Sequence, residues 1–80
     1  MNTAGNNWIE KEGRLTKDYQ FIDFVSALEF VNKVGVLAEK TGHHPDITFG
    51  WGYAHISVYT HDQAKLTDKD YDLAKQIDAI

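Results

Sequence analysis

The stretch EKTGHHPDITFGW, residues 39–51, joins a helical pattern to an alternating strand pattern. Gly42 stands where a glycine commonly ends a helix, and Pro45, the only proline of the chain, prevents the helix from continuing. Beyond the proline, apolar and small polar residues alternate as they do in a half-buried strand. The stretch therefore marks a boundary between helix and strand, and it places His43 and His44 in the connecting loop.

The segment before this boundary predicts a long helix with a wide apolar surface. Asp23 is its expected N-cap, and apolar or small residues recur from residue 24 up to residue 38 over roughly half of the helix circumference. A helix that covers a single sheet needs a narrower stripe. Two interpretations stay open: a generously apolar core helix, or a helix that contacts both its own sheet and a second subunit.

The other segments predict two hairpins and a second helix. Residues 8–21 carry strand-forming residues broken by Gly13, which predicts a hairpin turning at Glu12-Gly13. Alternating runs on either side of residues 50–52 predict another hairpin. Thr67 then has the sequence context of an N-cap that begins the last helix.

The order strand, strand, helix, strand, strand, helix predicts an α+β fold. Hairpins favour antiparallel pairing, and two amphipathic helices can cover one face of a four-stranded sheet. We expect a single domain over residues 8–80 and a short polar tail at residues 1–7. The expected core contains Leu28, Val31, Ile56, Val58, Leu73 and Ile77.

Composition narrows the classes of function. A chain of 80 residues forms one domain with a small core, for which oligomerisation is a common source of stability. With no cysteine, it has no disulfide and no thiolate metal site, and we expect a reducing, cytoplasmic location. The net charge of −4 and scattered lysines argue against nucleic-acid binding. Neither a membrane span nor a signal peptide is expected.

Three histidines and one acid are candidates for chemistry. His43 and His44 follow the first helix, His61 ends the fourth predicted strand, and Asp70 lies in the first turn of the last helix. Functional groups are often displayed at such element ends. Each residue also has an ordinary interpretation, because loop histidines are usually solvated and an acid at Asp70 would support the helix cap.

Proton transfer suits this set better than metal binding. His44 precedes proline and is pushed toward an extended backbone, in which neighbouring side chains such as that of His43 point to opposite sides. No nucleophilic cysteine or serine and no glycine-rich phosphate loop is evident in the chain. Imidazole both donates and accepts protons near neutral pH. Imidazoles with a carboxylate therefore indicate elimination, addition or isomerisation.

The same residues resemble the motif of the pterin-4a-carbinolamine dehydratase family, also known as the dimerisation cofactor of a hepatocyte homeodomain factor. The motif positions present are Glu39, His43, His44, Pro45, Trp51, His61 and Asp70. The similarity reaches back through NWIEKEGRLTKDYQF and the first helix, so it covers nearly the whole chain from Trp8. Many family members carry a further helix before the position of Trp8, and this difference bears on assembly rather than on the motif.

The resemblance implies dehydration of 4a-hydroxytetrahydropterin to quinonoid dihydropterin, which recycles a tetrahydrobiopterin-type cofactor. No metal or organic cofactor is implied. By resemblance, His43 and His61 exchange protons with the substrate, and Asp70 holds a histidine in its working tautomer. The implied substrate-binding residues are His44, Pro45, Glu39 and Trp51.

The family also implies partners for the chain. These are a small-molecule pterin and further copies of the chain, as a homodimer or homotetramer. A different class of function stays open, because some relatives are non-catalytic binding proteins that stabilise a partner's oligomer or help an enzyme complex to assemble. A non-catalytic relative is expected to lack one of the three histidines, and this chain keeps His43, His44 and His61.

Overall fold

The computed structural model describes residues 8–60 and 65–80 of the chain. Their order along the chain is strand, strand, helix, strand, strand, helix, as predicted. The elements are β1 (Ile9–Lys11), β2 (Arg14–Gln20), α1 (Phe24–Thr41), β3 (Asp46–Gly50), β4 (Tyr53–Val58) and α2 (Asp68–Asp78). Within the described residues, neither helix is long and apolar enough to cross a lipid bilayer.

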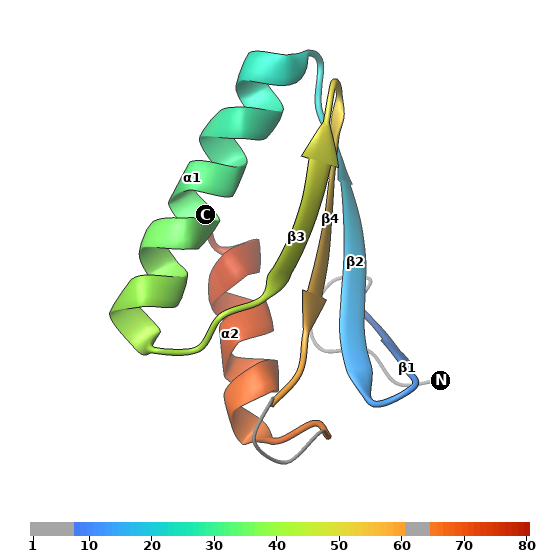
Figure 1. The fold of residues 1–80 in the computed structure, drawn as a ribbon, viewed down its shortest axis with the longest axis vertical. Coiled ribbons are helices and arrows are strands. Elements are labelled where there is room, and N and C mark those ends of the chain that lie inside the picture. The colour runs from blue at the N-terminus through green and yellow to red at the C-terminus, as the bar shows by residue number, and fades with distance from the viewer. Residues whose placement is uncertain (1–7, 61–64) are drawn as a thin grey trace.

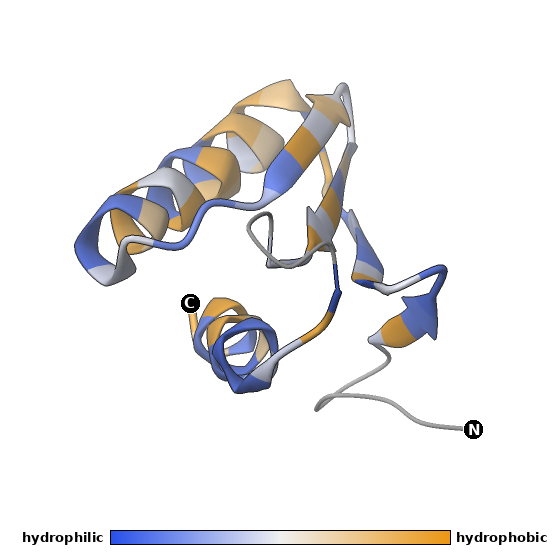
Figure 2. Cartoon of the chain, turned by 60° about the horizontal axis from the view of Figure 1, so that its bottom comes forward, coloured by the Kyte–Doolittle hydropathy of each residue, from blue (hydrophilic) through white to orange (hydrophobic). Residues whose placement is uncertain are grey.

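The strands form one antiparallel sheet in the order β1-β2-β4-β3. Both helices lie on the same face of this sheet, which confirms the predicted α+β architecture (Figure 1). Ile56 of β4 faces Lys17 of β2 on one side and Ile47 of β3 on the other. The strands show alternating apolar and polar bands in Figure 2, as expected when one face packs against helices.

Both predicted hairpin turns are present. Glu12 and Gly13 have φ angles of 53° and 76°, and two successive positive φ values are typical of the type I′ turns that join twisted strands. The turn between β3 and β4 contains Gly52, with φ of 81°. Phe21, just after β2, donates its backbone N–H to the Gly52 carbonyl at 2.8 Å, which ties this turn to the neighbouring strand.

The ends of α1 agree with the sequence prediction. The Asp23 side chain accepts a hydrogen bond from the Ser26 backbone N–H at 2.8 Å, which satisfies one of the exposed amides of the first turn. At the other end Gly42 adopts φ of 72°, and its N–H donates to the Ala38 carbonyl at 2.9 Å. The left-handed glycine reverses the chain, so that His43 begins the loop that leads to β3.

The core lies between the sheet and the two helices. Its fully buried members are Trp8, Leu15, Val34, Ile56, Val58, Leu73, Ala74 and Ile77. This confirms the four expected core residues on β4 and α2. Val31 is only half-buried, and the expectation for Leu28 is wrong in the single chain, because its side chain is 36% exposed. Leu28 belongs to the part of the wide apolar arc of α1 that does not reach the sheet.

A half-buried carboxylate explains why Lys17 interrupts the apolar face of β2. Asp78, in the last turn of α2, accepts hydrogen bonds from Trp8 Nε1 at 2.9 Å, Lys17 Nζ at 2.8 Å and Tyr19 Oη at 2.7 Å. We call these four residues the Asp78 cluster. Burial by itself would raise the pKa of Asp78, but the three donors outweigh it and hold this pKa below its usual value. Burial and the nearby Asp78 carboxylate raise the pKa of Tyr19.

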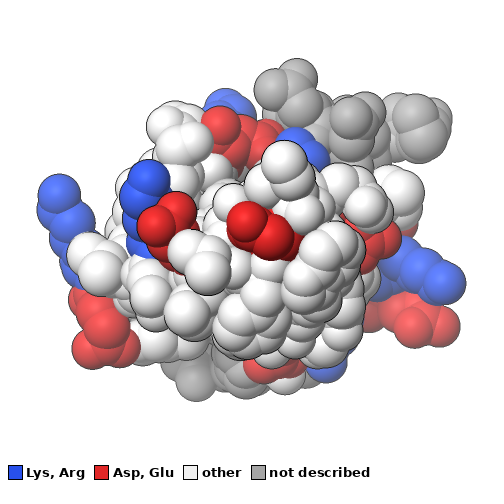
Figure 3. Space-filling view, turned by 90° about the horizontal axis from the view of Figure 1, so that it is seen from above, with Lys and Arg blue, Asp and Glu red and all other residues white. Residues whose placement is uncertain are grey.

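Several apolar side chains are exposed at the end of the molecule where α1 begins and β3 turns into β4. They are Ile22, Phe24, Val25, Trp51 and Tyr53, and we call them the apolar end. Figure 3 looks onto this end and shows a surface made mostly of residues other than Lys, Arg, Asp and Glu, with acidic groups near its middle. Large apolar side chains exposed together at one end of a molecule are a feature of interaction sites.

Candidate functional site

The C-terminal end of α1 and the N-terminal end of α2 lie at the same end of the molecule, opposite the apolar end (Figure 1). This arrangement brings together two of the residues that the sequence singled out. His43 Nε2 lies 2.5 Å from Asp70 Oδ1. The Asp70 side chain is fully buried, whereas 14% of the His43 side chain is exposed. A buried carboxylate therefore supports an imidazole that remains accessible to solvent.

The second oxygen of Asp70, Oδ2, is held by two polar groups. It accepts the Thr67 backbone N–H at 2.8 Å, which forms the carboxylate half of a capping box at the start of α2. It also accepts the Thr60 hydroxyl at 2.8 Å. Because Thr60 donates to the carboxylate, its oxygen accepts the Thr67 hydroxyl, 2.7 Å away. Asp70 thus fixes the start of α2 and the His43 ring at once.

This geometry assigns roles to the two ring nitrogens of His43. An ionised carboxylate only accepts hydrogen bonds, so with Asp70 ionised Nε2 is the ring nitrogen that carries hydrogen toward Oδ1. Nδ1 is then the nitrogen that can exchange a proton with a bound molecule. A partner that fixes one ring nitrogen is the usual way in which proteins set a histidine tautomer.

His44 has a different environment from His43. Its Nε2 lies 2.5 Å from Glu39 Oε2, and both side chains are largely exposed. The adjacent histidines thus have separate acidic partners, in line with the extended backbone expected before Pro45. Among the described residues, no group of three or more histidine, aspartate or glutamate side chains is arranged to hold a metal ion.

The other predicted site residues are placed as follows. Pro45 is half-buried just before β3. Trp51 is 71% exposed in the turn at the far end of β3. A strand of five residues spans about 15 Å, so one chain does not bring Trp51 near His43. His61 lies outside the described residues.

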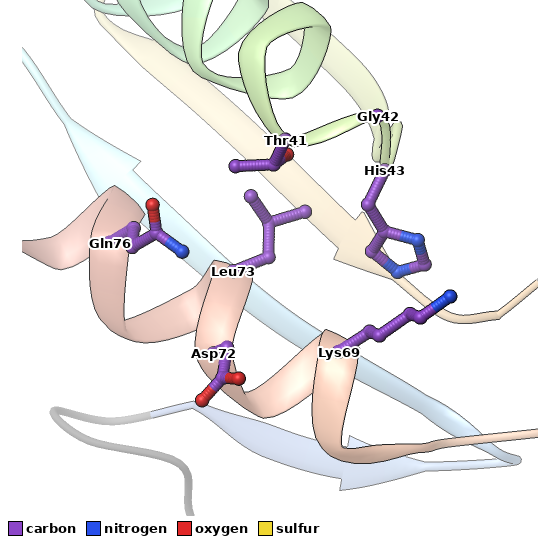
Figure 4. A pocket seen from close by; sticks show the side chains of 7 residues that line it. All are labelled: Thr41, Gly42, His43, Lys69, Asp72, Leu73 and Gln76. Carbon is purple, nitrogen blue, oxygen red and sulfur yellow. The ribbon is translucent and has the colours of Figure 1, made fainter.

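A pocket of about 210 Å³ adjoins the exposed side of His43 (Figure 4). It lies between the end of α1 and the outer surface of α2. The residues that line it are Thr41, Gly42, His43, Lys69, Asp72, Leu73 and Gln76. The volume is below the roughly 300–1,000 Å³ of pockets for drug-sized ligands, so it suits a small ring system rather than a dinucleotide.

Sequence reasoning missed both Thr60 and the α2 side of this pocket. Thr60 continues the inward-facing alternation of Ile56 and Val58, which was a usable signal for a buried hydroxyl near the helix cap. On α2, the pocket residues Lys69 and Gln76 are seven positions apart and so share a helix face. That spacing alone does not show that the face adjoins His43.

The chain belongs to the pterin 4 alpha carbinolamine dehydratase family, whose model matches residues 1–80. Provisionally named pterin-4-alpha-carbinolamine dehydratases are similar to it over most of its length. One from Rickettsia bellii is 45% identical over 81 residues, covering 100% of this chain and 72% of that protein. One from Rubrobacter xylanophilus is 48% identical over 69 residues, covering 86% of this chain and 64% of that protein.

Solved structures share the fold. A protein from Brucella melitensis described as a transcriptional coactivator/pterin dehydratase superposes with a TM-score of 0.82 at 25% identity, covering 91% of this chain and 78% of that chain. A pterin dehydratase-like protein described as a RuBisCO assembly factor in the alpha-carboxysome superposes with a TM-score of 0.77 at 24% identity, covering 99% and 94% of the two chains. The latter likeness concerns the fold alone.

Proposed function

We propose that this chain dehydrates 4a-hydroxytetrahydropterin to quinonoid dihydropterin and so recycles a tetrahydrobiopterin-type cofactor. The observation that supports the proposal most directly is the His43–Asp70 pair beside a small pocket, in a chain of the pterin 4 alpha carbinolamine dehydratase family. The pair supplies a partly exposed imidazole with a fixed tautomer, which is what a proton-transfer reaction on a small heterocycle requires.

The reaction needs two proton movements and no redox partner. The bond between the 4a carbon and its hydroxyl oxygen breaks as that oxygen gains a proton and leaves as water. The neighbouring ring nitrogen loses its proton, and its electron pair forms the new carbon–nitrogen double bond. We assign one of these transfers to Nδ1 of His43 and the other to His61, with Asp70 as the carboxylate that orients His43. General acid–base groups contribute typically about 10²–10⁴-fold each.

His44 and Glu39 have a separate place in the proposal. His44 follows His43 in the sequence, but its exposed side chain pairs with Glu39 rather than with Asp70. We assign His44 to orienting the pterin, with Glu39 fixing its ring and Pro45 fixing the backbone of the loop. Trp51 belongs to the substrate site only if a second copy of the chain brings its β3–β4 turn near His43, since β3 separates the two within one chain.

The proposal includes self-association into a homodimer or homotetramer. The sheet does not cover all of the apolar surface of α1, because Leu28 and Val36 are exposed. The apolar end adds further exposed apolar side chains. β1 and β3 are the edge strands of the sheet, and such edges can pair between subunits. Size-exclusion chromatography with light scattering at micromolar concentration should give a dimer or tetramer, and a strict monomer would contradict this part of the proposal.

A binding or assembly role is the alternative. The apolar end is the observation that favours it, because it offers a docking surface at the end of the molecule away from His43. The same fold occurs in the carboxysomal protein described as a RuBisCO assembly factor. The two functions are separable, since an assembly protein does not need the His43–Asp70 pair.

The deciding experiment is a dehydration assay with freshly generated 4a-hydroxytetrahydropterin. We expect turnover by the wild-type chain and a kcat about 10²–10⁴-fold lower in His43→Ala. His55→Ala is the matched control, because His55 pairs with Asp18 on the strands β4 and β2 and does not line the pocket. Activity should survive exhaustive chelation. An inactive wild-type chain, or full activity in His43→Ala, would refute the proposed function.

A further inference from the structure

The pocket beside His43 has a cationic group on its α2 side. Lys69 lines the pocket, and in Figure 4 its side chain extends toward the end of the pocket that is occupied by the imidazole ring. Among the described residues that line the pocket, it is the only lysine or arginine. Lys69 is exposed, so its ammonium is available to a molecule that enters from solvent.

Lys69 and Asp70 are consecutive residues in the first turn of α2, and they lie on different sides of the His43 ring. Asp70 is buried and bonds Nε2 of the ring. Lys69 lies in the pocket itself, where a reacting molecule must sit in order to meet Nδ1. The same helix start therefore presents a carboxylate to the imidazole and an ammonium to whatever the imidazole acts on.

The chemistry of the substrate class gives that ammonium a specific partner. In a 4a-hydroxytetrahydropterin, the ring carbon next to the 4a carbon carries a carbonyl oxygen. An ammonium has three donors and no acceptor, so it selects a carbonyl oxygen and rejects an amino group at the same position. A pterin whose 4a-hydroxyl lies at His43 necessarily places this carbonyl within one bond of the reacting carbon.

We propose that Lys69 is a substrate-positioning residue that donates a hydrogen bond to the carbonyl oxygen beside the carbinolamine carbon and thereby sets the 4a-hydroxyl against His43. This inference rests on the proposed dehydratase function. The other polar lining groups, Asp72, Gln76 and Thr41, surround the rest of the pocket and are not needed for this contact.

Steady-state kinetics of two lysine variants test the inference. Lys69→Met keeps the length of the side chain and removes its donors, and we expect KM to rise about tenfold, as for the loss of one charged hydrogen bond at an exposed site. Lys75→Met is the matched control, because it removes the same charge from the same helix outside the pocket. Lys69→Arg should recover most of the affinity, since it restores a cationic donor.

A binding experiment separates positioning from a general effect of charge. The probes are 7,8-dihydropterin and its counterpart with an amino group in place of the carbonyl. We expect the wild-type chain and Lys75→Met to prefer the carbonyl compound about tenfold and Lys69→Met to lose this preference.

The outcomes distinguish the two proposals. If the wild-type chain is active but Lys69→Met matches Lys75→Met in KM and in ligand preference, the role of Lys69 is wrong and the proposed function stands. A wild-type chain that does not dehydrate its substrate overturns both.

Discussion

Thr60 is the residue that connects the last strand to the acid behind His43. Its hydroxyl donates to Asp70 Oδ2 at 2.8 Å and is almost wholly buried. Thr60→Val has nearly the same shape and removes this donor, which leaves a buried carboxylate oxygen with one partner fewer. We expect a lower kcat with KM nearly unchanged, and a loss of stability of about 1–3 kcal/mol.

Thr60→Ser is the control for this prediction, because it keeps the hydroxyl and loses only a methyl group. It should retain most of the wild-type kcat. The measurements are steady-state dehydration kinetics and chemical unfolding of each variant. If Thr60→Val loses less stability than predicted and also keeps the full kcat, the hydroxyl has no part in orienting the His43–Asp70 pair.

For individual residues, the sequence predicted the members of the candidate site better than the hydrogen bonds between them. The motif resemblance singled out both His43 and Asp70, and the structure brings them into contact. Helix-cap chemistry also predicted the bond between Asp70 and the start of α2. Neither argument could supply Thr60, because its contact joins a strand end to a helix start, and such a contact exists only once the sheet and α2 have packed.

The end of α1 is the element that sets where His43 begins. Gly42 closes the helix with a positive φ of 72°, and a Cβ built on it would meet nothing within 4 Å. Gly42→Ala is therefore strained by its backbone alone, which costs roughly 1–2 kcal/mol. Because the strain falls one residue before His43, we expect reduced kcat together with reduced stability, measured by turnover and chemical unfolding.

Gly35 provides the matched control for this prediction. It lies inside α1, and an added Cβ there also meets nothing within 4 Å. Gly35→Ala should stabilise the helix by about 0.5–1 kcal/mol without changing kcat. A destabilised Gly35→Ala would show instead that another chain covers this side of α1, and an unstrained Gly42→Ala would contradict the role of the left-handed cap.

Element boundaries were predictable where local chemistry fixes them and less so where packing does. Asp23, Gly42 and Thr67 mark helix ends by their own hydrogen-bonding or backbone preferences, and the structure confirms each of them. Periodicity also predicted burial of Leu28, yet its side chain is exposed in the single chain. Periodicity shows that a face is apolar, but it does not show which part of that face its own sheet can reach.

The Asp78 cluster joins the first strands to the last helix and makes the stability of the whole molecule depend on pH. The pKa of Asp78 is lower in the fold than in the unfolded chain, where an aspartate titrates near about 3.9. The carboxylate therefore contributes stability that is fully present above about pH 4 and is lost as the pH falls through the folded pKa. The backbone hydrogen bond from Ser26 also lowers the pKa of Asp23, so its contribution to stability is likewise lost as the pH falls.

Asp78→Asn tests this dependence. The variant keeps the side-chain shape but leaves the Lys17 ammonium without its charged partner, so we expect a loss of about 1–3 kcal/mol at pH 7. The difference from wild type should shrink at pH 3, which lies below the unfolded-state pKa, because protons there bind the unfolded chain more than the folded one. Urea unfolding at both pH values provides the measurement. Asp72→Asn is the control. If the difference in unfolding free energy between Asp78→Asn and wild type stays constant with pH, Asp78 is not the source of the pH dependence.

Parts of the whole-molecule arrangement were accessible from sequence because two hairpins and two amphipathic helices have few compatible packings. The α+β architecture follows from that count of elements. The Asp78 cluster was not predicted, although Lys17 on an otherwise apolar face was its visible sign. Residues 17 and 78 are at opposite ends of the chain, and only the finished packing of α2 against β2 brings them together.

The bonds that Asp70 makes to Thr67 and to His43 have a consequence for how activity reports on the protein. If His43 works as proposed, fraying of the first turn of α2 also removes the contact that fixes its imidazole tautomer, so the two losses become one event. The fraction of molecules in which this turn is closed then sets a ceiling on the active fraction. Such local opening requires less free energy than global unfolding, so turnover should decline in mild denaturant while the sheet is still intact.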